Sequence, residues 1–115
     1  MKALVPPPDV VWTDIGAVID VPRRGARRVP TPQGDIAVFR TGDGGVFALF
    51  DRCPHKAGPL SQGIVHGQTV TCPLHGWTIE LATGHPTGAD AGKGCVHIAP
   101  VEVREGRIFL GSAGR

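Results

Sequence analysis

The stretch that decides the fold runs from Cys53 to Trp77 and reads CPHKAGPLSQGIVHGQTVTCPLHGW. Each end of it carries one cysteine and one histidine: Cys53 and His55 first, then, after sixteen residues, Cys72 and His75. Thiolate and imidazole ligands suit iron–sulfur or zinc centres rather than magnesium or calcium. The stretch therefore offers four ligands for one metal centre.

The residues beside these ligands favour tight loops. A proline, Pro54 or Pro73, follows each cysteine, fixes its own φ and biases the preceding residue toward extended geometry. Gly76, directly after the second histidine, allows backbone angles that other residues avoid. We expect two proline-stiffened loops that face each other across the metal.

The order of the ligands indicates which metal. Zinc fingers usually present two ligands of one type close together, whereas here each loop has one of each type. If both cysteines bind one iron and both histidines the other, the product is the [2Fe–2S] arrangement of Rieske centres. A zinc-bound structural module, which predicts a colourless protein, and a chance pattern are the alternatives, but the mixed pairs favour iron–sulfur.

The sequence from Cys53 to Gly84 resembles the cluster-binding region of a Rieske ferredoxin. The resemblance implies an all-β, Rieske-type (ISP) fold, in which a small antiparallel β-barrel or sandwich base carries an inserted cluster-binding subdomain. It also implies one [2Fe–2S] cluster per chain. We expect a single domain over 1–115, with a base at about 10–52 and 87–111, a cluster-binding subdomain at about 53–86 and a flexible tail at 1–9.

Composition limits the other possibilities. The 115 residues are 41% hydrophobic and 19% charged, with 17 Gly and 11 Pro, which favours short strands and loops over long helices. A net charge of +2 is too small to suggest nucleic acid, and the arginines have no interleaved aromatic residues for stacking on a single strand. We expect them to lie in a solvated loop rather than a docking patch; they are Arg23, Arg24, Arg27 and Arg28.

No apolar run approaches the roughly 18 residues of a membrane span, and Pro6-Pro7-Pro8 ends the apolar N-terminal run early. We therefore expect a cytoplasmic protein with no membrane partner.

Alternating and β-rich runs predict the strands. Trp12 is expected to anchor the core, because large rings dominate burial in small domains. A weak turn is expected at Glu105-Gly106. The expected strands are 35–40 paired with 46–50, the two arms of a hairpin within 63–71 that turns near His66-Gly67, 77–81, 96–98, 101–104 and 107–110, with fraying from 111 onward.

The third cysteine, Cys95, has no partner left if the cluster assignment holds, which excludes an internal disulfide. We expect a small packed residue there, and ordinary surface or structural roles for His66, His85 and His97. Rieske proteins of respiratory complexes carry a further cysteine in each loop, but Gly58 or a neighbour and Leu74 hold those places. The resemblance therefore implies the soluble ferredoxin type, in a reducing compartment.

Residues after the second histidine set the expected potential. High-potential Rieske proteins carry Gly-Ser-x-Tyr there, whose hydroxyls stabilise the reduced state, whereas this chain has Gly76-Trp77-Thr78-Ile79. Both hydroxyl positions are apolar. We expect a potential near the low end of the range of about −150 to +300 mV.

A narrower resemblance is to the small subunit of bacterial NAD(P)H-dependent nitrite reductase. Its motifs are CPHK, GPLSQGIV, CPLHGW and GCV, within roughly residues 10–111. It implies a large catalytic subunit with FAD, [4Fe–4S] and sirohaem that reduces nitrite to ammonia, and an electron-transfer subunit with no catalytic residues here. The alternative is a stand-alone Rieske ferredoxin that supplies electrons to a ring-hydroxylating dioxygenase.

Overall fold

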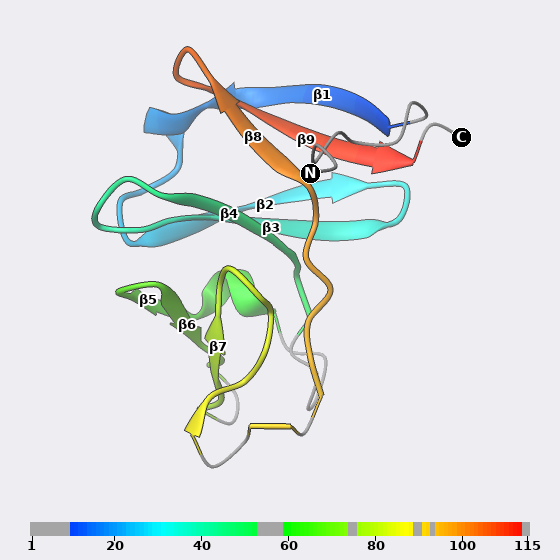
Figure 1. The fold of residues 1–115 in the computed structure, drawn as a ribbon. Helices are drawn as coiled ribbons and strands as arrows, with labels where there is room; N and C mark the ends of the chain where they lie inside the picture. The colour runs from blue at the N-terminus through cyan, green and yellow to red at the C-terminus, as the bar shows by residue number, and fades with distance from the viewer. Residues whose placement is uncertain (1–9, 53–58, 74–75, 89–90, 93, 114–115) are drawn as a thin grey trace, which may run out of the picture.

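The computed structural model describes residues 10–52, 59–73, 76–88, 91–92 and 94–113, so the tail predicted for 1–9 lies outside it. The described part is built from strands and short 3₁₀ segments, as the composition predicts (Figure 1). The 3₁₀ segments are η1 (Val18–Asp20) and η2 (Leu60–Gln62). The strands are β1 (Val10–Ala17), β2 (Gly25–Thr31), β3 (Gly34–Arg40), β4 (Val46–Phe50), β5 (Ile64–His66), β6 (Thr69–Thr71), β7 (Thr78–Glu80), β8 (Val101–Arg104) and β9 (Arg107–Ala113).

Three antiparallel sheets are stacked along the molecule. Their strand orders are β1-β9-β8, β2-β3-β4 and β5-β6-β7, and the second sheet lies between the other two (Figure 1). The expected all-β architecture is confirmed, with a sandwich-like base that is not a closed barrel. No helix in the described part of the chain is long and apolar enough to cross a membrane.

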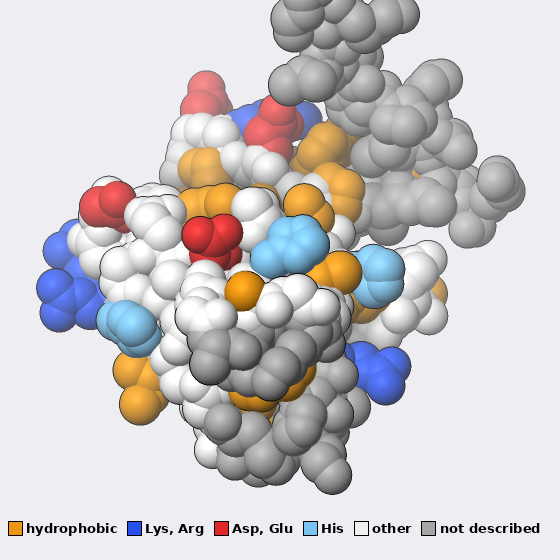
Figure 2. Space-filling view, turned by 60° about the horizontal axis from the view of Figure 1, so that its bottom comes forward, with side chains coloured by type: hydrophobic (Ala, Val, Ile, Leu, Met, Phe, Trp, Pro, Cys, Tyr) orange, Lys and Arg blue, Asp and Glu red, His pale blue; other side chains and the backbone are white. Residues whose placement is uncertain are grey.

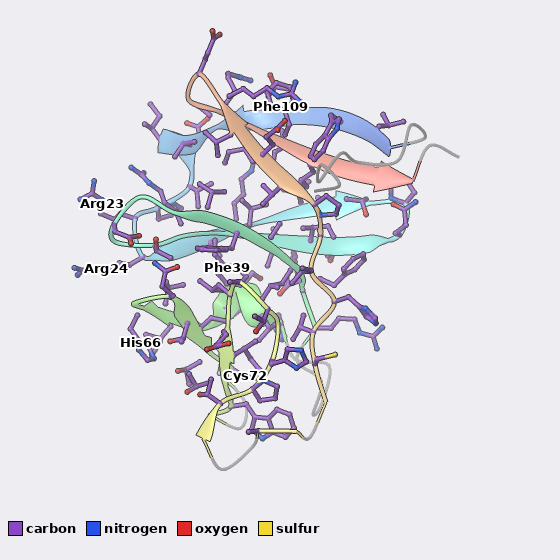
Figure 3. All side chains as sticks on the ribbon, viewed as in Figure 1. Arg23, Arg24, Phe39, His66, Cys72 and Phe109 are labelled. Carbon is purple, nitrogen blue, oxygen red and sulfur yellow. The ribbon has the colours of Figure 1, made fainter. Side chains whose placement is uncertain are left out.

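The central strand β3 supplies both cores. Its residues alternate in direction, so that Ala37 and Phe39 face η2 and the sheet β5-β6-β7, while Ile36 and Val38 face the sheet β1-β9-β8. All four side chains are buried, and Figure 3 shows Phe39 between the middle and lower sheets. A strand that is buried on both faces consists of a continuous apolar run. This explains the four apolar residues IAVF within the sequence DIAVFR.

The three predicted hairpins are present. β3 pairs with β4, β5 pairs with β6, and β8 pairs with β9. The last hairpin turns through Glu105 at φ 50° and Gly106 at φ 77°. A non-glycine residue at positive φ is uncommon, which is why the sequence signal for this turn is weak.

Four expectations about the strands and core of the base are wrong. Arg27 and Arg28 are exposed residues of a strand, β2, rather than of a loop. β2 is an edge strand of its sheet, and an edge tolerates its charges and Pro30. Figure 3 shows Arg23 and Arg24 extending away from the molecule just before β2.

The other three concern Trp12, 96–98 and the end of the chain. Trp12 is half-buried at the surface, with the Arg104 guanidinium 5.9 Å from its ring centroid, rather than in the core. Residues 96–98 form no strand and contribute an isolated bridge between Ile98 and Leu49. β9 continues to Ala113 because its last residues pair with β1 instead of fraying; residues 114–115 lie outside the described residues.

Candidate metal centre

The second predicted ligand loop begins where β6 ends. β6 and β7 pair in register from Thr71 opposite Thr78. Beyond that pair, the Cys72 N–H donates to the Trp77 carbonyl at 2.7 Å, and the Gly76 N–H donates to the Cys72 carbonyl at 3.1 Å. Gly76 has φ 72°, a value that favours glycine. Main-chain hydrogen bonds therefore close this loop, with Cys72 at its start.

Cys72 is the one predicted ligand that the described residues include; Cys53, His55 and His75 lie outside them. Its side chain is 2% exposed and carries no disulfide. It packs in the core between the middle and lower sheets, together with Trp77, and Figure 3 shows it on the side of β5-β6-β7.

The first predicted ligand loop is bounded by Asp51 and Ser61. The Asp51 N–H donates to the Asp35 carbonyl at 2.9 Å, which continues the β3–β4 pairing past the end of β4. The buried Asp51 carboxylate accepts two hydrogen bonds from Ser61, one from the N–H at 2.7 Å and one from the hydroxyl at 2.6 Å. These bonds join the two flanks of the segment that contains Cys53 and His55.

Gly63 lies in close contact with β6. A Cβ at this position would lie 2.3 Å from the Thr71 carbonyl oxygen and 2.9 Å from Cγ2 of Val70. The Gly63 N–H also donates to the Leu60 carbonyl at 2.9 Å, which ends η2. The end of the first loop therefore lies directly against β6, the strand that leads to Cys72.

Comparison with known proteins identifies the family. Residues 11–102 match the model of the Rieske [2Fe-2S] domain. The chain belongs to the Rieske [2Fe-2S] family. This Rieske domain implies a Rieske-type [2Fe–2S] cluster as its cofactor and a role in electron transfer within oxidoreductase systems.

Relatives of this Rieske domain occur both alone and inside larger proteins. It is 39% identical over 95 residues to the 3-phenylpropionate/cinnamic acid dioxygenase ferredoxin subunit of Photorhabdus laumondii, a match that covers 81% of this chain and 87% of the relative. It is also 39% identical over 83 residues, 70% of this chain, to the 4β-methylsterol monooxygenase of Methylococcus capsulatus, but spans 22% of that protein.

A solved structure gives a third relative. The putative NADH-dependent nitrite reductase small subunit of Mycobacterium tuberculosis superposes with a TM-score of 0.78 at 27% identity, over 90% of this chain and 96% of that one.

The residues of this Rieske domain fit the cluster. The four predicted ligands are two thiols and two imidazoles, and Cys72, the predicted ligand thiol that the structure describes, is buried and free of a disulfide. Among the described residues, no group of three or more His, Cys, Asp or Glu gathers elsewhere as a competing metal site.

The side chains after the second histidine are packed into the fold. Trp77 and Ile79, the two residues on which the low-potential prediction rests, are buried. The intervening Thr78 hydroxyl lies 3.3 Å from the Thr71 hydroxyl across the β6–β7 pair, so its hydrogen-bonding capacity is used within the sheet.

The remaining cysteine differs from its expectation. Cys95 is exposed rather than packed. Its neighbour Val96 is buried, and the Val96 N–H donates to the Gly84 carbonyl at 2.7 Å. Because Val96 takes the inward position, the side chain before it faces solvent.

The other histidines lie on the surface. His66 is in the β5–β6 hairpin, with Nε2 3.1 Å from the Thr71 hydroxyl. His97 packs edge-on against Phe50 at a ring separation of 6.4 Å, and His85 is exposed. Imidazole and hydrophobic side chains both reach the surface on the face shown in Figure 2.

Sequence reasoning missed Asp51 and Ser61. An acidic residue two positions before the first ligand cysteine, followed by a serine ten positions later, was the available signal. This signal does not predict the pairing, because the contact depends on how the two segments approach each other in the fold.

Proposed function

We propose that Cys53, His55, Cys72 and His75 hold the [2Fe–2S] cluster, with both cysteines on one iron and both histidines on the other. The observation that carries this assignment is the buried, disulfide-free Cys72 in a loop closed by main-chain hydrogen bonds. A loop held in this way presents its ligand in a preset geometry, which favours binding of the cluster over a folded but metal-free alternative.

The cluster, when bound, supplies storage for one electron at a time. The protein's part is to hold the thiolates deprotonated, to keep the cluster beside a largely apolar core, and to present it to a partner. Histidine ligation leaves the oxidised centre formally near neutral rather than near −2, which raises the potential relative to a four-cysteine centre. The buried Trp77 and Ile79 offer no hydroxyl donor, which supports a potential at the lower end of the Rieske range.

We also infer the division of the chain. Residues 53–86 would form the cluster-binding unit, inserted into a base made of 10–52 and 87–111. The sheet β5-β6-β7 and η2 belong to the first, and the two other sheets to the second.

The partner that best fits is the large subunit of an NAD(P)H-dependent nitrite reductase carrying FAD, [4Fe–4S] and sirohaem. The motifs CPHK, GPLSQGIV, CPLHGW and GCV support this partner, as does the nearly full-length superposition on a nitrite reductase small subunit. Reduction of nitrite to ammonia takes six electrons, so the chemistry belongs to the large subunit and this chain acts as its electron-transfer subunit. A cytoplasmic location follows from a soluble NAD(P)H donor.

A second candidate is a stand-alone ferredoxin for a ring-hydroxylating dioxygenase. The specific observation in its favour is the 39% identity to a dioxygenase ferredoxin subunit, higher than the 27% identity to the nitrite reductase small subunit. The resemblance of the motifs above to the nitrite reductase small subunit, together with the nearly full-length superposition, supports the first candidate, so we rank this candidate second.

The first experiment is an absorption spectrum of freshly purified protein, followed by electron paramagnetic resonance after dithionite reduction. We expect a red-brown protein with a reduced signal averaging near g of about 1.9, the signature of the mixed-ligand centre. A colourless, silent sample would indicate zinc or no metal and would contradict the electron-transfer assignment.

The second experiment separates the two partners. We expect the tagged chain to co-purify with a sirohaem-containing large subunit when the two are co-expressed. Electron delivery to a purified ring-hydroxylating oxygenase, without binding to the sirohaem subunit, would favour the ferredoxin instead.

A further inference from the structure

We propose that Asp51 is a positioning residue for the first ligand loop, acting through Ser61. This inference rests on the proposed function, because it concerns the residues that present Cys53 and His55. Asp51 lies two positions before Cys53, and Ser61 lies six positions after His55. The link between them spans the whole first ligand pair.

The contact itself is strong. Asp51 is 7% exposed, and both of its carboxylate oxygens accept hydrogen bonds from Ser61. Hydrogen bonds to an ionised acceptor are roughly twice as strong as neutral ones. A buried carboxylate without such donors is costly, so the folded chain strongly favours this one pairing.

The two ends of the link are themselves held. The Asp51 main chain is attached to the middle sheet through the Asp35 carbonyl. On the other side, Leu60 is fully buried in the core that also contains Cys72. A rigid attachment at both ends means that the link restricts where the intervening ligands can lie, and does so relative to Cys72.

Asp51 does not belong to the metal-binding set in this inference. Its two oxygens are occupied by Ser61, so it acts on the cluster through the chain. A partner of this kind, outside the ligand set but fixing its orientation, typically changes metal affinity by about 10–100-fold when removed.

The chain provides a control in another loop of the middle sheet. Asp43, exposed in the β3–β4 loop, accepts hydrogen bonds from the Thr41 hydroxyl and the Gly45 N–H, and also from the Gln68 side-chain amide at 3.0 Å. It therefore makes the same two types of contact as Asp51, together with one bond to the β5–β6 hairpin, on a loop that bounds no predicted ligand.

The test compares iron release to a chelator from purified, cluster-loaded variants, with β-sheet content followed on the same samples by circular dichroism. We expect Asp51→Ala to release iron about tenfold faster or more, and Asp43→Ala to stay within about twofold of the unmodified protein. Equal acceleration by Asp51→Ala and Asp43→Ala would show general loosening and overturn the proposal, as would unchanged release from Asp51→Ala.

If Asp51→Ala does not fold, a milder pair of substitutions tests the same proposal. Ser61→Ala removes one of the two bonds, and Thr41→Ala removes the equivalent hydroxyl from Asp43. We expect Ser61→Ala to release iron about threefold faster, Thr41→Ala to match the unmodified protein, and Ser61→Thr, which keeps the hydroxyl, to restore slow release. Equal rates for Ser61→Ala and Thr41→Ala would overturn the proposal.

A spectroscopic measurement separates positioning from stability. We expect the reduced-state resonance of Ser61→Ala to broaden or shift, whereas that of Thr41→Ala stays the same. Failure of this inference is distinguishable from failure of the proposed function. An unmodified protein that holds no cluster contradicts the proposed function. A cluster-loaded protein whose iron release does not change on substitution of Asp51 contradicts only the inference.

Discussion

The two predicted ligand loops are held in different ways. The loop that begins at Cys72 is closed by main-chain hydrogen bonds between its own ends, as an extension of the β6–β7 pair. The flanks of the loop that contains Cys53 are joined by a side chain, the Asp51 carboxylate, which accepts from Ser61. A main-chain closure tolerates side-chain change, whereas a side-chain closure depends on one residue pair. The two loops should therefore respond differently to substitution.

The largest expected effect is at Cys72. Cys72→Ser should abolish the visible absorption of the cluster, because a neutral hydroxyl replaces a thiolate ligand. It should also destabilise the protein by about 1–3 kcal/mol, since the hydroxyl is buried in an apolar core. Iron content and chemical unfolding measure the two effects.

Cys95→Ser is the matched control, because the same change falls on an exposed cysteine. We expect normal iron content and a stability change within about 0.5 kcal/mol. Retention of the cluster by Cys72→Ser would remove Cys72 from the ligand set.

The next largest effect is expected at Gly63, which lies against β6. Gly63→Ala would place a methyl group 2.3 Å from the Thr71 carbonyl oxygen, and overpacking of this kind costs about 1–3 kcal/mol. Because β6 must move to accommodate it, we expect faster iron release as well as lower stability. Thermal unfolding and chelator assays measure both.

Gly67→Asn is the control for this change. Gly67 lies at φ 58° with open space around it, and asparagine tolerates that conformation. We expect a nearly neutral variant, and equal effects at Gly63 and Gly67 would show that the close contact with β6 does not matter.

A smaller effect tests the second loop directly. Thr71→Val removes a hydroxyl that lies 3.3 Å from the Thr78 hydroxyl and 3.1 Å from Nε2 of His66. We expect a loss of about 0.5–1.5 kcal/mol with iron release unchanged, because the main chain closes this loop. Release as fast as in Ser61→Ala would mean that side chains hold both loops.

The smallest effect is a pH dependence outside the ligand loops. The Thr41 hydroxyl first, and then the Gly45 N–H, hold the pKa of Asp43 below its ordinary value of 3.8. A lowered folded-state pKa contributes stability that is present above the unfolded pKa and lost as the pH falls through the folded value. The stability difference between the unmodified protein and Asp43→Asn should therefore shrink below about pH 4.

Thermal unfolding between about pH 5 and pH 3 measures this difference. Asp14, whose pKa is lowered by hydrogen bonds from Arg107 first, titrates in the same direction, but it is common to both proteins and cancels in the comparison. A difference that stays constant across this range would contradict the assignment to Asp43.

Much of the fold was predictable because its signals are local. The hairpin of β3 and β4 follows from two β-rich runs around a glycine-rich loop, and the turn at Gly67 from a short polar interruption between alternating residues. β2 was missed because an edge strand accepts arginines and a proline, so its sequence resembles a loop. The placement of Trp12 was missed because a large ring can also be half-buried under an arginine at the surface.

By itself, the sequence determined the family and predicted the ligand set, since a Cys-x-His pair and a Cys-x-x-His pair at a distinctive spacing indicate a donor set without reference to the fold. It also determined that the chain would be built from short strands. The tertiary structure alone decided that Asp51 meets Ser61, that Gly63 lies against β6, and that β3 supplies two cores. These are contacts between segments whose approach depends on how the sheets stack, and no local pattern of residues encodes that distance.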